Sequence, residues 1–224
     1  MNNLSLIIFL SLFTITTYAA KPIDLRIYLG VNNSKATVTQ DGEDYNLESN
    51  FNSYFNFFSG LNIDEFLAFQ AGYKQYSYAF EADSSTEVEN ALGVASQLYG
   101  QIRWKLSIIS IILGFSSYSS FYPDIDSSED VELKSLKMFN WKVGSSIALF
   151  GDESNGPVAG VEIINKLLAD DIESFLSINT FLEYAIGNQA FSYFLRGDYY
   201  YESLSTEDAS MKDHILLFSV GIGI

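Results

Sequence analysis

Residues 92–104 read L-G-V-A-S-Q-L-Y-G-Q-I-R-W, and this stretch decides the fold. Large apolar side chains at Leu92, Val94, Leu98, Ile102 and Trp104 alternate with glycine, alanine and polar residues. A repeat of two residues indicates a β-strand, because successive side chains point to opposite faces. The stretch is also as long as the roughly ten residues that a tilted strand needs to cross a membrane.

The same alternation recurs at least eight times along the chain. The final example carries its apolar positions at Leu216, Phe218, Val220, Ile222 and Ile224. The opposite face of these strands carries Gly, Ser, Ala, Asn, Gln and Tyr rather than a row of charges, and a narrow lumen accommodates such residues. We therefore predict an all-β fold, a closed antiparallel transmembrane β-barrel. A soluble secreted β-sandwich is the alternative.

The composition excludes several classes of protein. The 224 residues include 12 Lys+Arg and 28 Asp+Glu, which gives a net charge of -16 and argues against nucleic-acid binding. The absence of cysteine excludes disulfides and thiolate metal sites. Hydrophobic residues make up 48% of the chain, too many for a disordered acidic protein.

The N-terminus has the pattern of a secretory signal peptide. An apolar run, LSLIIFLSLFTI, covers residues 4–15 and is too short for a transmembrane helix. The following T-Y-A ends at Ala19 and is typical of a cleavage site. We predict a signal peptide over residues 1–19 and a barrel domain over residues 20–224.

Acidic residues concentrate in four segments between the predicted strands. They are Asp41, Glu43, Asp44 and Glu48; Glu81, Asp83, Glu87 and Glu89; Asp124, Asp126, Glu129, Asp130 and Glu132; and Glu202, Glu207, Asp208 and Asp213. Short segments at 62–65, 104–106 and 187–189 alternate with them. Long loops on one side and tight turns on the other are typical of an outer-membrane barrel, so we expect long acidic extracellular loops.

The number of strands depends on residues 157–167, PVAGVEIINKL. Counting this stretch as a strand gives ten strands, which is our prediction. Residues 161–168 also have helical spacing, which supports an alternative of eight strands with residues 136–170 as an extracellular excursion.

Residues 60–73, GLNIDEFLAFQAGY, carry a family resemblance. A strand end, an Asn/Asp-rich turn and a strand ending in small-Gly-Tyr are similar to the periplasmic hairpin of the OmpA/OmpX-like small outer-membrane barrels. The resemblance implies the outer membrane of a Gram-negative bacterium as the location, and no cofactor. It implies outer-membrane lipids, lipopolysaccharide and the barrel assembly machinery as partners. The family includes pores, closed structural barrels and adhesins, so it indicates location better than activity.

Several charged residues fall on the predicted inner face. They are Arg26, Lys74, Arg103, Lys142, Glu183, Arg196 and Asp198, joined by Glu162. Unpaired charge in a poorly hydrated interior is costly, so we expect a lumen charge network of ion pairs. A selectivity lining in a water-filled pore is the alternative.

The outward face is expected to carry an aromatic girdle at the membrane interfaces. Its predicted members are Trp104, Trp141, Tyr73, Tyr199 and Tyr201, with both tryptophans near strand ends.

The single histidine, His214, lies beside Asp213 and could serve a barrel hydrolase, although its position in the alternation places it outward. The acidic segments lack a D-x-D-x-D-G loop, so no metal site is expected. We predict a non-enzymatic structural or porin-like barrel, with a surface adhesin or a His214 hydrolase as alternatives.

Overall fold

The structure is a computed structural model that describes residues 23–82, 91–125, 131–150, 155–169, 171–187 and 191–224. The predicted signal peptide, residues 1–19, lies outside this range. The strands are β1 (Ile23–Gln40), β2 (Glu43–Asn62), β3 (Leu67–Ala82), β4 (Ala91–Leu106), β5 (Ile109–Ile125), β6 (Val131–Ala148), β7 (Gly156–Ala169), β8 (Ser174–Gly187), β9 (Ser192–Ser205) and β10 (Ala209–Gly223). Within the described ranges, no helix is long and apolar enough to cross a membrane.

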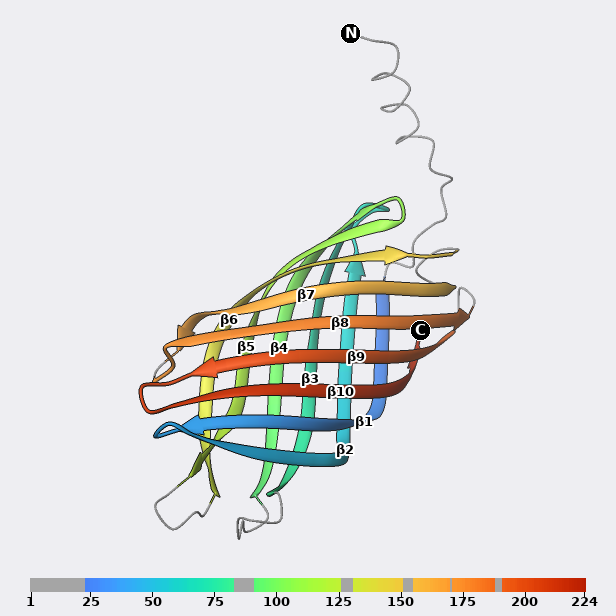
Figure 1. The fold of residues 1–224 in the computed structure, drawn as a ribbon. Helices are drawn as coiled ribbons and strands as arrows, with labels where there is room; N and C mark the ends of the chain where they lie inside the picture. The colour runs from blue at the N-terminus through green and yellow to red at the C-terminus, as the bar shows by residue number, and fades with distance from the viewer. Residues whose placement is uncertain (1–22, 83–90, 126–130, 151–154, 170, 188–190) are drawn as a thin grey trace.

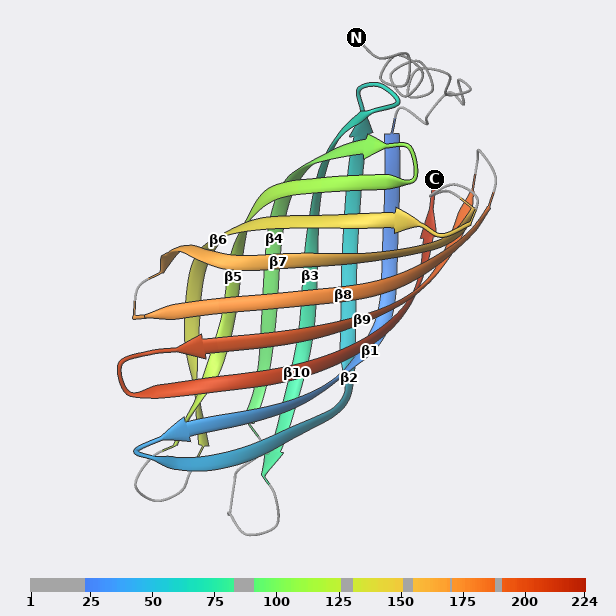
Figure 2. The same cartoon turned by 45° about the horizontal axis from the view of Figure 1, so that its top comes forward.

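The ten strands form a closed antiparallel barrel, which confirms the predicted fold (Figure 1). Each strand pairs with its neighbours in the chain, and β1 also pairs with β10 from Arg26↔Gly223 to Gln40↔Ala209. The turned view shows the β1 and β10 ribbons side by side where the sheet closes (Figure 2). Each strand is therefore paired with a neighbour on both sides, and the sheet has no free edge strand.

The count of ten strands is right, and the alternative of eight is wrong. Residues 157–167 lie in β7, which pairs with β6 and β8. This segment contains the β-branched residues Val158, Val161, Ile163 and Ile164, which favour strands. Pairing on both sides outweighs the helical spacing of the same residues.

An apolar belt surrounds the barrel. We use this name for the outward-facing apolar side chains on one half of each strand. This is the half that lies toward the end of the barrel where β1 begins and β10 stops. Its members include Leu29, Phe57, Phe69, Leu98, Leu113, Trp141, Val161, Leu182, Leu195 and Val220, one from each strand, all exposed. In β10 the alternation is strict, since Val220 is 62% exposed whereas Leu217 is fully buried. Exposure of so much apolar surface indicates that hydrocarbon, not water, surrounds this half of the barrel.

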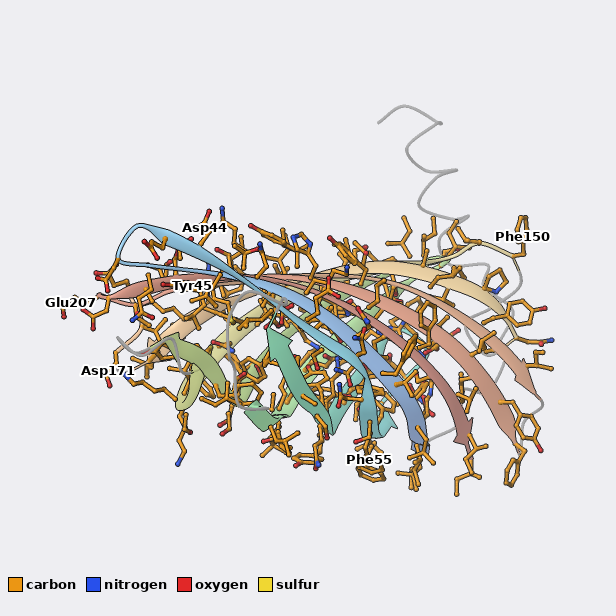
Figure 3. All side chains as sticks on the ribbon, turned by 60° about the horizontal axis from the view of Figure 1, so that its bottom comes forward. Asp44, Tyr45, Phe55, Phe150, Asp171 and Glu207 are labelled. Carbon is orange, nitrogen blue, oxygen red and sulfur yellow. The ribbon has the colours of Figure 1, made fainter. Side chains whose placement is uncertain are left out.

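We call the end of the barrel where β1 begins and β10 stops the terminal end, and the opposite end the far end. Toward the far end the outward face becomes polar, except around exposed apolar residues on β2, β4 and β7, namely Phe51, Leu92, Val94, Leu167 and Leu168. The polar outward residues there include Lys35, Thr37, Gln75, Ser119, Lys137, Ser203 and Lys212. The strands therefore continue well beyond the belt. Asp44, Asp171 and Glu207 lie at the far end, and Phe150 lies at the opposite end (Figure 3).

Two of the predicted acidic loops are wrong. β1 and β2 are joined by only Asp41 and Gly42, whose φ angles of 55° and 86° match the two-residue hairpin turn that an Asp-Gly pair favours. Glu43, Asp44 and Glu48 lie in β2. β9 and β10 are separated by residues 206–208 alone, so Glu202 and Asp213 also lie in strands. Charge clustering misidentified the first segment because strands outside a membrane tolerate charge on their solvent face, as Asp44 and Glu48 show. In the second segment, Glu202 and Asp213 face into the barrel and are buried.

The other two acidic segments are described only in part. Glu81 belongs to β3, and Asp124 and Glu132 belong to β5 and β6. Residues 83–90 and 126–130, which include Asp83, Glu87, Glu89, Asp126, Glu129 and Asp130, lie outside the described residues.

The interior has two different halves. Near the terminal end it is polar, as predicted. Toward the far end it is filled by an apolar core that includes Val38, Tyr78, Phe80, Phe121 and Leu217, so the expectation of a polar lumen holds only for the belt half. The rings of Tyr78 and Phe80 stack at 5.4 Å, and Phe121 meets Tyr78 edge-on at 5.3 Å. Strands that leave the membrane need such a core, because apolar burial is what holds a water-exposed barrel together.

Candidate functional site: the charged lumen

Glu183 is the centre of an ion-pair network inside the belt half of the barrel. It lies on β8 directly opposite Arg196 of β9 in the strand register. Its carboxylate accepts hydrogen bonds from Arg196 Nη1 at 3.3 Å, from Arg26 Nη1 at 3.1 Å and from the Tyr28 hydroxyl at 2.9 Å. Closure of the barrel brings Arg26, on the first strand, to Glu183 on the eighth.

Each of the two arginines has a second carboxylate on its own strand. Arg26 Nη2 lies 2.7 Å from Asp24 Oδ2, and Arg196 Nη2 lies 2.7 Å from Asp198 Oδ1. Residues two apart on a strand have their side chains on the same face of the sheet. Arg26 and Asp24 therefore both point inward, as do Arg196 and Asp198. Asn179 also donates to Asp198 at 3.1 Å. Each of the two arginines and three carboxylates in this cluster therefore has a partner of opposite charge, as buried charge requires.

The flat guanidinium groups also lie on aromatic rings. Arg26 sits 4.4 Å from the centroid of Phe194, and Arg196 sits 4.1 Å from that of Phe181. Arginine is suited to this position because its planar group can bond carboxylates at its edge and contact a ring with its face. The rings therefore close the lumen around the ion pairs.

The two lysines occupy a second part of the network. Lys142 lies 3.3 Å from Glu162, and both side chains are buried. Lys74 donates to the hydroxyl of Tyr200 at 3.2 Å. The ring of Tyr99 lies 4.8 Å from the Lys142 ammonium and 5.5 Å from that of Lys74. These cations are held by a carboxylate and by phenol rings and hydroxyls together.

Arg103 lies nearer the terminal end, on β4. It donates from Nη2 to Ser146 Oγ of β6 at 3.0 Å, and so bridges across the intervening strand. Close to it, Gln101 donates to Gln70 at 2.7 Å. The structure thus places all seven predicted network residues on the inner wall. It joins Arg26, Glu183, Arg196 and Asp198 directly. Lys74, Lys142 and Arg103 bond to Tyr200, Glu162 and Ser146.

The space left inside the network is small. A cavity of about 70 Å³ is lined by Tyr28, Lys74, Arg103, Glu162 and Glu183, among others. Since a water molecule needs about 10–15 Å³ of such volume, the cavity has room for a few waters. The side chains of the network therefore surround a cavity of that size at this level.

Sequence reasoning missed two members of the network, Asp24 and Tyr28. Both share the even-numbered face of β1 with Arg26, so strand parity could have identified them as inward-facing. Nothing in the sequence, however, indicated that Tyr28 would donate to Glu183.

The predicted girdle residues all face outward. Trp104 is 44% exposed and lies near the end of β4, at the terminal-end rim of the belt. Trp141, 36% exposed, lies in the middle of β6 rather than near a strand end, because β6 continues beyond the belt. Tyr73, Tyr199 and Tyr201 lie toward the opposite rim, where the outward face turns polar. Aromatic residues at such rims suit the interface between hydrocarbon and headgroups.

His214 faces outward, and Asp213 faces into the barrel and is 3% exposed. The Nδ1 atom of His214 lies 2.6 Å from the hydroxyl of Tyr199, and the ring of Tyr201 lies 5.3 Å away. The sheet therefore separates the histidine from the neighbouring carboxylate that a hydrolase would use to orient it. In the part of the chain that the structure describes, no group of three or more His, Cys, Asp or Glu could hold a metal ion.

No model of a protein family matches the chain, and no curated protein matches it. Among solved structures, the outer membrane protease OmpT of Escherichia coli is similar with a TM-score of 0.51 at 11% identity, over 94% of this chain and 98% of that chain. An outer membrane channel of Pseudomonas putida F1 gives a TM-score of 0.50 at 9% identity, over 94% of this chain and 100% of that chain. The chain therefore has the fold of outer-membrane β-barrels.

Proposed function

We propose that this chain is a non-enzymatic outer-membrane β-barrel protein of a Gram-negative bacterium, of the OmpA/OmpX-like kind, with a closed lumen. The filled interior carries this proposal. The Glu183 network occupies the belt half and surrounds a cavity of about 70 Å³, and aromatic residues occupy the far half. An eight-stranded barrel has an interior just wide enough for side chains, and ten strands leave slightly more, so large and charged side chains are needed to fill this one. The role is structural rather than that of an open pore.

The proposal includes an orientation and partners. The terminal end faces the periplasm, and the far end projects from the cell. The apolar belt contacts outer-membrane lipids, with lipopolysaccharide at the rim formed by Tyr199, Tyr201 and His214. The barrel assembly machinery recognises the last strand, residues 216–224, during insertion. The alternating apolar face of that strand supports this assignment.

Conductance across a planar lipid bilayer tests the closed lumen. The folded protein is expected to give no discrete conductance steps under conditions in which an open porin conducts. The double variant Glu183→Ala, Arg196→Ala removes two facing side chains of the plug, and it is expected to introduce small steps. Stable steps from the wild-type protein would contradict the proposal. Gel migration with and without heating shows that each sample is folded.

Surface adhesion is a second candidate, and the shape of the far end favours it. The strands project beyond the belt as paired, packed sheet that ends in acidic turns, with Asp44 and Glu207 at the tip (Figure 3). A rigid charged projection suits recognition of a basic partner. Asp44→Asn with Glu207→Gln is expected to reduce binding to host cells if adhesion is the function, and unchanged binding would count against it. The hydrolase alternative is not favoured, since Asp213 and His214 lie on opposite faces.

A further inference from the structure

Two carboxyl groups point into the barrel beyond the apolar belt. Glu202 of β9 and Asp213 of β10 are directly opposite in the strand register, and they are 8% and 3% exposed. On the outer face at this level lie polar residues, Ser203 and Lys212. The pair is therefore outside the membrane-spanning part of the strands, inside the apolar far half. Opposite residues on one face of a sheet have Cβ atoms about 5 Å apart.

The groups around the pair are neutral. Ser34 of β1 donates to Asp213 Oδ1 at 2.6 Å, and Tyr118 of β5 donates to Glu202 Oε2 at 3.4 Å. Ser177 of β8 lies opposite Glu202 in register. On their own strands, the inward neighbours are Tyr200, Leu204, Met211 and Ile215, all buried. The hydroxyl of Tyr200 accepts a hydrogen bond from Lys74 at 3.2 Å.

The other titratable groups that face the pair are phenols. Tyr118 and Tyr78 interact electrostatically with both carboxyls, and Tyr76 with Glu202. Among the described groups that act on either carboxyl, there is no lysine or arginine. This pair differs in that respect from Glu183, which two arginines neutralise.

Two adjacent carboxylates without a cation cannot both stay ionised cheaply in an apolar interior. Burial, and then the neighbouring Asp213, raise the pKa of Glu202 to about 7. Burial also raises the pKa of Asp213, to about 6, although the hydrogen bond from Ser34 opposes this rise. The hydrogen bond from Ser34 stabilises the ionised form of Asp213. Glu202 is therefore the more readily protonated of the two carboxyls.

We propose that Glu202 and Asp213 form a proton-binding site, in which one proton is held by the pair at neutral pH, with Glu202 protonated and Asp213 ionised. Both carboxyls release their protons near pH 4 in the unfolded chain. The folded state therefore binds more protons than the unfolded state between about pH 4 and pH 7. The contribution of the pair to stability is then greatest below about pH 4 and falls as the pH rises to about 7, by up to about tenfold in the folding equilibrium constant per pH unit for one proton.

The test compares the wild-type protein with Glu202→Gln, which mimics the protonated side chain at every pH. Urea unfolding of the full chain in detergent micelles is followed at several values from about pH 5 to pH 8. The wild-type midpoint is expected to fall with rising pH. The variant is expected to show a flatter profile and, at pH 8, a folding equilibrium constant at least about tenfold larger than that of the wild type. Glu65→Gln, in an exposed turn at the terminal end, is the control and should keep the wild-type profile.

Two results would overturn the proposal: a variant with the same slope as the wild type, or one less stable than the wild type at pH 8. Infrared spectroscopy of the wild-type protein gives an independent readout if the variant does not fold. A protonated carboxyl band at pH 7 that disappears in alkali supports the site, whereas its absence at pH 7 excludes it.

Discussion

Replacing Glu183 with glutamine removes the charge at the centre of the lumen network. The side chain accepts bonds from Arg26, Arg196 and Tyr28 and is buried. Removing one partner of a buried ion pair costs about 3–5 kcal/mol. In the variant each arginine keeps its second carboxylate, at 2.7 Å. We therefore expect a loss in the free energy of unfolding at the lower end of this range, about 3 kcal/mol.

The matched control is Glu48→Gln. Glu48 pairs with Lys35 at 2.7 Å, a shorter distance than either arginine contact of Glu183. The two control side chains are 53% and 64% exposed, and an exposed pair contributes less than about 1 kcal/mol. The comparison therefore separates the effect of burial from that of distance.

Urea unfolding of the protein in micelles, followed by the fluorescence of Trp104 and Trp141, measures both variants. The free energy of unfolding follows from the midpoint and slope of the transition. Equal losses for the two variants, or a loss below 1 kcal/mol for Glu183→Gln, would refute the reasoning that the buried network holds this half of the barrel together.

Three further predictions concern the wall of the barrel and use the same unfolding measurement. Val220→Arg places a charge in the middle of the belt and is expected to cost about 2–4 kcal/mol in lipid vesicles, whereas Ser203→Arg, beyond the belt, should cost less than about 1 kcal/mol. Gly72→Val is expected to cost about 1–3 kcal/mol, because a Cβ at position 72 would lie 2.3 Å from the Tyr99 hydroxyl. Gly42→Ala should cost about 1–2 kcal/mol through backbone strain alone, since its φ is 86° and no atom lies within 4 Å of an added Cβ. A stable Val220→Arg barrel in vesicles would contradict the belt.

Strand parity predicted which way most side chains face. Leu98 and Val220 point outward and Arg103 and Glu183 point inward, as their positions in the alternation indicated. The same rule, applied to Asp213 through its neighbour His214, would have placed Asp213 inside. The acidic residues around it predict a loop instead, and that prediction is wrong because Asp213 lies in β10. The length of each strand beyond the belt was not predictable either, since alternation alone does not show whether the outer face meets lipid or water.

The contacts within the lumen could not be predicted from the chain alone. Arg26 and Glu183 are 157 residues apart in the sequence. They meet only because β1 pairs with β10 and because the register of each strand pair is fixed. A shift of two residues in any pairing would keep every side chain on its face and still separate this pair. Likewise, the opposition of Glu202 and Asp213 follows from the β9–β10 register.

The strand character, the outward apolar surface and the inward position of the charges follow from the amino-acid sequence, because the direction of a side chain is a local property of an extended backbone. Which charges become partners and how the far half is filled follow from the folded barrel. Those features depend on closure and register, which are set by all ten strands together.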